Sequence, residues 1–144
     1  MTMSNISQNK LVEKSFELLI KCMMQSKHRL MELGSNMGLP GMQAMMVLML
    51  DQPKPMNSFT KIFNCDASNI TGIVDGLEEK ELAARFPSTR DRRIKMIELS
   101  ETGKELRNQL LSALVEQHKS ALFNLTTEEI GQLNRLLSKI VVQE

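Results

Sequence analysis

Apolar residues recur at a helical period near the start of the chain, in a stretch without Pro or Gly. These positions are Val12, Phe16, Leu19, Met23, Leu30 and Met31. The pattern predicts one long helix from about Ser7 to Leu33, ending near Gly34 and Gly38. A chain of this size has too few other elements to cover so long a helix, so we expect a partner chain to cover part of it.

A second apolar helix is predicted where Pro40 suits the first helical turn and where Pro53 and Pro55 end the segment. Its apolar positions are Met42, Met45, Met46 and Leu50. The uninterrupted apolar run from Ala44 to Leu50 is far shorter than the roughly 20 residues that a membrane span requires. We therefore expect no contact with a membrane.

Two short helices joined by a turn are predicted next. Asn57 is a suitable N-cap for a helix through about Phe63, and Asp66 is a suitable N-cap for the helix that follows. The second of these helices carries Ile70, Val74 and Leu77 on one face. This is the outline of a helix-turn-helix, which many all-helical proteins share.

A hairpin with a basic tip follows the two short helices. The segments 85–87 and 94–99 flank the sequence STRDRR, and the second segment is rich in apolar and β-branched residues. A helix-turn-helix followed directly by such a hairpin is a winged helix, in which the tip is the wing. The fold class predicted is therefore mainly α with a small β-hairpin wing.

The last two predicted helices carry clear start signals. Ser100 caps the first, and Thr126 with Glu129 forms the capping box of the second. The apolar positions are Leu106, Leu110, Leu114, Ala121 and Leu122, followed by Ile130, Leu133, Leu137, Ile140 and Val141. The chain thus begins and ends in apolar helices, with the winged helix-turn-helix between them.

Charge is concentrated at the predicted wing. Residues 85–95 carry +4, although the whole chain carries only +1. A local basic cluster on a near-neutral protein suggests phosphate contacts confined to one segment, or else a solvated loop. The chain has no Trp or Tyr and only five Phe, which argues against the stacking surfaces of single-stranded nucleic acid binders. Duplex DNA remains the compatible nucleic acid.

Other function classes find little support in the residues. Gly-rich phosphate loops, nucleophile elbows and HExxH motifs are absent, so no enzyme and no cofactor is expected. His28 and His118 lie in no close ligand cluster, so no metal site is expected. The polar N-terminus lacks a signal peptide, and Cys22 and Cys65 form no disulfide framework. We therefore expect a cytoplasmic protein.

The segment RFPSTRDRRIKMIELSETG, residues 85–103, resembles the wing signature of the MarR (multiple antibiotic resistance regulator) family. That signature is Asp-x-Arg at the wing tip, a strand, then Leu-Thr or Leu-Ser, two residues and Gly. Residues 68–78 also resemble the family's recognition helix. The family usually has Gly at the position of Glu81 and Leu at that of Cys65, where a buried thiol is an ordinary replacement.

The resemblance implies a division of the chain. Residues 1–144 form a single MarR-like unit, with a winged-helix DNA-binding lobe at about 40–100 and a helical dimerisation region at 1–35 and 101–144. It also implies a homodimer that places two recognition helices about one DNA turn apart on a pseudo-palindromic operator.

The predicted recognition helix offers a small, polar face. Ser68, Thr71, Gly72 and Asp75 follow helical spacing on that face, and Asn69 is placed to pair with adenine N6 and N7. The helix backbone would then approach the floor of the major groove, and the helix N-terminus favours a phosphate. A carboxylate facing DNA is repelled, so we expect Asp75 at the groove edge or paired with an Arg.

At the wing, the resemblance assigns Arg93 to insertion into the minor groove and Asp91 to a salt bridge that orients it. The physics of narrow A·T-rich minor grooves, which attract Arg, supports this assignment. Arg90 and Arg92 would meet the flanking phosphates.

The function predicted is a sequence-specific, ligand-responsive transcription repressor. The resemblance implies a small hydrophobic or aromatic-acid effector between the dimer region and the winged lobe. Methionines could line an adaptable pocket there, or could simply fill the core: Met23, Met24, Met31, Met42, Met45, Met46 and Met49. Two alternatives stay open: a thiol-based redox sensor through Cys22, and a winged-helix protein–protein adaptor without DNA binding.

Overall fold

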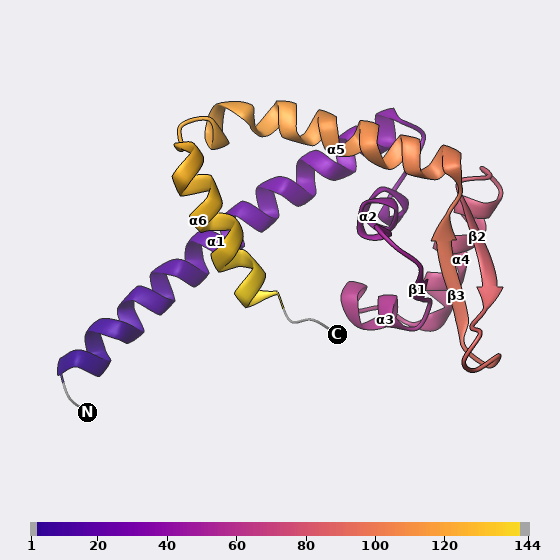
Figure 1. Cartoon of the computed structure of the whole chain (residues 1–144), viewed down its shortest axis with the longest axis horizontal. Helices are drawn as coiled ribbons and strands as arrows, with labels where there is room; N and C mark the ends of the chain where they lie inside the picture. Colours follow the sequence, from indigo (N-terminus) through magenta and orange to yellow (C-terminus); the bar gives the residue numbers. More distant parts are fainter. Residues whose placement is uncertain (1–2, 142–144) are drawn as a thin grey trace.

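The computed structural model describes residues 3–141, without the side chains of residues 3–6, 120 and 121. The helices are α1 (Met3–Asn36), α2 (Met42–Met49), α3 (Ser58–Phe63), α4 (Ala67–Glu78), α5 (Glu101–Leu122) and α6 (Thr127–Ile140). The strands are β1 (Lys54–Pro55), β2 (Ala83–Pro87) and β3 (Lys95–Leu99). Helices α2–α4 and the sheet form one lobe, which α5 joins to the half of the molecule built by α1 and α6 (Figure 1).

Helix α1 extends a few residues beyond both predicted ends and packs against α2 and α5. The contact with α2 is close, because a Cβ added at Gly34 would lie 2.3 Å from the Cβ of Ala44. Helix α2 begins at Met42, so Pro40 lies before the helix and not in its first turn as predicted. Gly41 precedes the helix with φ 58°, a conformation that a Pro-Gly turn can adopt and a helix cannot.

The helix-turn-helix consists of α3 and α4. Asp66 caps α4 as predicted, with its carboxylate accepting from the backbone N–H of Asn69 at 2.9 Å. Asn57 precedes α3 as predicted, but its side chain makes no capping bond. The Ser58 hydroxyl instead donates to the carbonyl of Pro55 at 2.7 Å and ties the start of α3 to β1.

The sheet has a third strand that the sequence pattern did not reveal. Its order is β1-β3-β2, with both neighbouring pairs antiparallel. Pro55 lies in the two-residue edge strand β1, where a missing N–H is tolerated. Strands β2 and β3 form the predicted wing hairpin, with Arg85 opposite Ile97. The winged helix-turn-helix is therefore confirmed.

The hydrophobic core lies where α2, α3, α4, the sheet and the first half of α5 meet. Its largest fully buried side chains are Phe59, Leu39, Met46, Ile70, Leu77, Ile97, Leu110, Val47 and Val74. Gly103 allows α5 to approach the sheet, since a Cβ there would lie 2.0 Å from the carbonyl oxygen of Leu82. Ser100 caps α5 by accepting from the N–H of Gly103 at 3.0 Å.

Large apolar side chains are left exposed on α1, on the second half of α5 and on α6. Among the described residues, only Met49, Ile62 and Ile94 of the exposed large apolar set lie in the winged-helix lobe. None of the side chains of α6 is buried, although Thr126 and Glu129 form the predicted capping box. Across residues 3–141, no helix combines the length and the apolarity needed to cross a bilayer.

Candidate nucleic-acid interface

The outward face of α4 is uncharged along its first two turns. Ser68, Asn69, Thr71 and Gly72 are all exposed, whereas Ile70 on the opposite face is buried. The hydroxyl of Ser68 donates to Asp66 at 2.8 Å, and that of Thr71 donates to the carbonyl of Ala67 at 2.9 Å. Both hydroxyl oxygens therefore present acceptor lone pairs outward. At Gly72, an added Cβ would meet nothing within 4 Å, so the space beside the helix backbone is open to a ligand.

The N-terminus of α4 is already occupied by a carboxylate. The N–H of Asn69 and the hydroxyl of Ser68 both donate to Asp66 and lower the pKa of its carboxyl below the ordinary value. This negative charge lies where we expected the helix N-terminus to favour a phosphate. The basic wing is therefore the better candidate for phosphate contacts.

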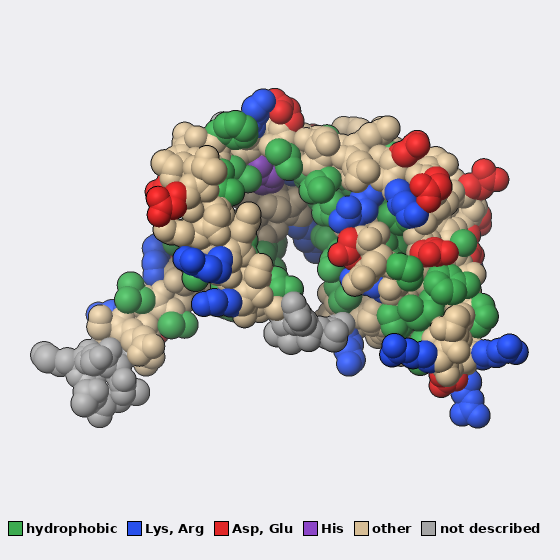
Figure 2. All heavy atoms as spheres, in the orientation of Figure 1, with side chains coloured by type: hydrophobic (Ala, Val, Ile, Leu, Met, Phe, Trp, Pro, Cys, Tyr) green, Lys and Arg blue, Asp and Glu red, His purple; other side chains and the backbone are tan. Residues whose placement is uncertain are grey.

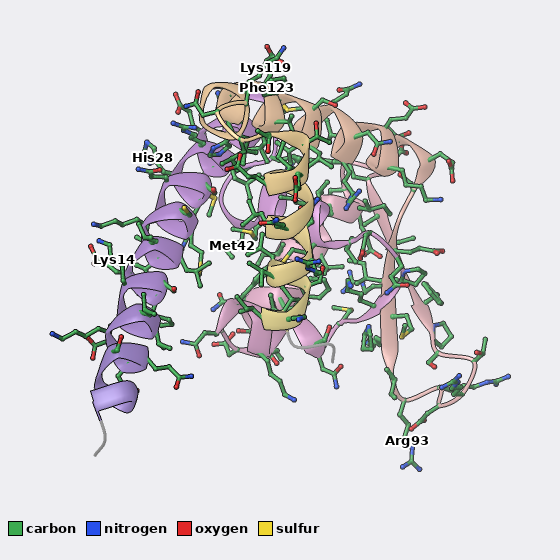
Figure 3. All side chains as sticks on the ribbon, turned by 60° about the vertical axis from the view of Figure 1, so that its left-hand side comes forward. Lys14, His28, Met42, Arg93, Lys119 and Phe123 are labelled. Carbon is green, nitrogen blue, oxygen red and sulfur yellow. The ribbon has the colours of Figure 1, made fainter. Side chains whose placement is uncertain are left out.

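The wing tip between β2 and β3 is organised by backbone bonds and projects from the body of the protein. Asp91 accepts from the backbone N–H of Arg93 at 2.9 Å, and its own carbonyl accepts from the N–H of Ile94 at 3.0 Å. Asp91 thus shapes the turn. We expected its carboxylate to form a salt bridge with the guanidinium of Arg93, but in this structure it accepts from the backbone N–H of Arg93 instead. Arg90, Arg92 and Arg93 are exposed, and Arg93 points away from the body (Figure 3).

A shallow depression brings the helix-turn-helix and the wing together. Its volume is about 260 Å³, and Thr71 of α4 and Arg93 of the wing both line it. The remaining lining residues are Met56, Asn57, Thr60, Ala67, Ile70, Ile94 and Lys95. Sequence reasoning singled out Thr71 and Arg93 and counted Lys95 in the basic cluster. It missed Asn57 and Thr60 as members of this surface. In Figure 2 the Lys and Arg side chains at the lower right surround the wing.

Arg85 does not belong to the free basic cluster, although we counted it there. Its guanidinium forms ion pairs with Asp75 and Glu78 of α4. Its Nε donates to Glu78 at 3.0 Å, and its backbone N–H donates to the other oxygen of Glu78 at 2.9 Å. Asp75 is therefore paired, one of the two outcomes expected. The exposed cations of the wing are Arg90, Arg92, Arg93 and Lys95.

Neither the two cysteines nor the two histidines line this depression. Cys22 is exposed on α1, and Cys65, expected to be buried, is half-buried at the turn before α4. His118 on α5 approaches Arg29 on α1, with 3.1 Å between its Nδ1 and the guanidinium. Among the described side chains, no three His, Cys, Asp or Glu residues cluster closely enough to hold a metal ion.

Residues 43–95, which contain the helix-turn-helix and the wing tip, match the model of the MarR family. This segment is similar in sequence to the MarR family. The chain is also 33% identical over 88 residues to YpoP of Bacillus subtilis strain 168, an uncharacterised HTH-type transcriptional regulator. That similarity covers 61% of this chain and 62% of YpoP, less than two thirds of either protein.

Solved structures share the fold beyond the segment that matches the MarR model. A MepR point mutant from a multidrug-resistant clinical isolate of S. aureus has a TM-score of 0.67 at 20% identity, covering 90% of this chain and 94% of that chain. Apo wild-type MarR from E. coli has a TM-score of 0.66 at 21% identity, covering 88% and 96%. A second S. aureus MepR mutant, bound to an oligodeoxyribonucleotide, has a TM-score of 0.57 at 20% identity, covering 88% and 95%. At these identities, the likeness establishes the winged-helix fold.

Proposed function

We propose that this protein is a sequence-specific regulator of transcription that binds duplex DNA through α4 and the wing. The observation that carries the proposal is the shared depression, where Thr71 of the uncharged α4 face lies with the exposed cations Arg93 and Lys95. DNA readers need positive charge for phosphates and small or polar side chains at base edges. The DNA-bound MepR relative has the same fold, which supports this proposal.

The roles proposed for individual residues follow from their positions. Ser68, Asn69, Thr71 and Gly72 lie on the exposed face of α4 and would meet base edges in the major groove. Arg93 projects from the wing tip and would enter the minor groove. Arg90 and Arg92 would bind phosphates, while Asp91 holds the turn that presents Arg93.

We propose that the protein acts as a homodimer on a pseudo-palindromic operator. A single α4 and a single wing read a short site, and two-fold symmetry doubles it. Most of the exposed large apolar side chains lie on α1, α5 and α6, away from the wing, and give the dimer its surface. This arrangement leaves both wings free for DNA, with residues 1–35 and 101–144 as the dimerisation region.

We extend the proposal to repression relieved by a small hydrophobic or aromatic-acid effector. Met31, Met42 and Met45 are only half-buried near the junction of α1 and α2, between the apolar helices and the winged-helix lobe. Flexible thioether side chains adapt to ligands of different shape. Release of bound operator DNA on adding a set of aromatic carboxylates tests this extension, and release by none of them contradicts it.

The test of DNA binding is selection from randomised duplexes at two salt concentrations, followed by sequencing of the retained DNA. We expect a pseudo-palindrome with half-sites about one helical turn apart and binding that weakens steeply with salt. Recovery of no sequence above background by a folded dimer would favour the protein–protein adaptor.

Arg93→Ala tests the wing on the selected operator. We expect its affinity to fall by about tenfold or more at moderate salt, the scale of one good groove contact. Lys104→Ala is the matched control, because it removes the same charge from an exposed side chain on α5. Equal affinity for both variants would remove Arg93 from the interface.

A further inference from the structure

We propose that Arg85 is a specificity-determining positioning residue, which holds the carboxylates of Asp75 and Glu78 away from the base edges. The inference rests on the proposed DNA-binding function. It gives a role in DNA recognition to a residue of β2, outside the proposed recognition helix α4. Arg85 would act through α4 and need not touch DNA.

The geometry joins the two elements at several points. The guanidinium of Arg85 pairs with Asp75 and with Glu78, one helical turn apart on α4. The backbone N–H of Arg85 also donates to Glu78, so strand β2 holds this carboxylate even without the side chain. The Arg85 side chain is only 26% exposed, compared with 48% for Asp75. The planar guanidinium suits this double pairing, which the single ammonium of Lys cannot reproduce.

The position of Asp75 explains why the pairing matters. Asp75 shares the helical face of Ser68, Thr71 and Gly72, so it lies in line with the proposed base-reading positions. An unpaired carboxylate there would repel phosphates and would accept a hydrogen bond from cytosine N4. Paired with Arg85, the same carboxylate is neutralised and its Oδ1 is engaged. Arg85 therefore suppresses a cytosine preference that the sequence of α4 alone would favour.

Two other roles for Arg85 make different predictions. If Arg85 bound a phosphate directly, Asp75→Asn would release it for DNA and raise the affinity, and Arg85→Ala would reduce the salt dependence by about one phosphate contact. If Arg85 only stabilised the fold, Arg85→Ala would lower the melting temperature, but the folded fraction would bind DNA as the natural protein does.

The experiment compares the natural chain with Arg85→Ala, Arg85→Gln, Asp75→Asn and the double variant Arg85→Ala/Asp75→Asn. Affinity for the selected operator and base preference by randomised selection are measured well below each melting temperature. We expect Arg85→Ala to weaken binding by about tenfold, the cost of roughly one lost base contact, and to enrich cytosine in the half-site. Arg85→Gln keeps most of the side chain without the charge and should show the same two effects. It replaces Arg85→Ala in the comparison if Arg85→Ala does not fold.

The double variant carries the decisive comparison. Removing the charge of Asp75 should restore most of the affinity lost with Arg85 and abolish the new cytosine preference. An unchanged base preference in Arg85→Ala and Arg85→Gln, or a double variant as weak as Arg85→Ala, overturns the inference while the DNA-binding function stands. Failure of the natural chain to bind any duplex overturns the proposed function and this inference with it.

Discussion

Glu81 occupies a backbone conformation that few residues other than glycine adopt readily. It lies in the turn between α4 and β2 with φ 57°, in the left-handed region. Its N–H donates to the carbonyl of Glu78 at 2.8 Å, and its carbonyl accepts from the hydroxyl of Ser100 at 2.7 Å. The turn is thus held by hydrogen bonds on both sides, and the MarR-family resemblance had marked this position as one where Gly is usual.

Replacing Glu81 with Gly should therefore stabilise the protein. Relief of the left-handed strain outweighs the extra backbone entropy that Gly loses on folding, for a net gain of about 0.5–1 kcal/mol. The midpoint of urea unfolding measures this gain. Glu79→Gly is the matched control, since Glu79 has φ −57° and should lose stability on the same change. A loss of stability in both variants would contradict the strain argument.

At the scale of elements, the sequence predicted the helix caps Asp66, Ser100 and Thr126 but not the pairing of strand β1 with β3. The caps Asp66, Ser100 and Thr126 were identified because an N-cap depends only on the next three residues. Strand β1 was missed because a two-residue strand containing Pro55 has no period, and its pairing with β3 joins residues about forty positions apart.

The candidate site shows the same division between local and long-range information. The exposed face of α4 follows from helical spacing, and the structure does expose Ser68, Asn69, Thr71 and Gly72. Arg85 was misassigned to the basic cluster, because its charge is visible in the sequence but its partners on α4 are not. The spacing of Asp75 and Glu78, one helical turn apart, was the available signal for a paired cation.

The junction of α4 with β2 should make stability depend on pH in a defined direction. The guanidinium of Arg85 lowers the pKa of the Glu78 carboxyl from its ordinary value of 4.5. A carboxyl whose pKa is lower in the folded state contributes stability above the unfolded pKa, and this contribution is lost as pH falls through the folded value. The Glu78 contribution should therefore be complete above about pH 5 and should disappear as the pH falls below 4.5.

Glu78→Gln provides the test of this dependence. The free energy of unfolding, measured by chemical denaturation, should fall less between pH 7 and pH 3 for Glu78→Gln than for the natural chain. The difference should be at most about 1 kcal/mol, the scale of a partly exposed ion pair. Glu128→Gln on α6 is the control and should follow the natural chain. An equal loss for Glu78→Gln and the natural chain would mean that the ion pair contributes nothing measurable.

At the scale of the whole molecule, the exposed cations of the wing lie apart from the apolar side chains that α1 and α6 expose. The cations of the wing lie at one end of the winged-helix lobe, and α1 and α6 expose apolar side chains at the other side of the molecule (Figures 1 and 2). In Figure 3 the first half of α1 and the whole of α6 stand apart from each other. Two helices that leave their apolar faces uncovered within one chain need a partner, and symmetry offers a second copy.

Leu136→Lys/Ile140→Lys tests this partner directly. Both side chains are more than half exposed in the single chain and lie one turn apart on α6. If a second copy covers them, two buried charges should raise the dissociation constant of the dimer by at least about a hundredfold, since each lost apolar side chain is worth roughly 1.5–3 kcal/mol. Sedimentation velocity across a concentration series measures this change.

The control places the same two charges on the polar side of α6, as Gln132→Lys/Ser138→Lys. Both side chains are exposed and neither is one of the apolar positions of α6, so the dimer should persist. The monomer released by Leu136→Lys/Ile140→Lys should keep the winged-helix core, because α6 buries no side chain against it. It should also lose the pseudo-palindromic operator while retaining weak, salt-sensitive binding to duplex DNA. If this monomer bound the full operator as tightly as the natural chain, one protomer would suffice to recognise the DNA. The apolar side chains of α1 and α6 would then bind a partner other than a second copy.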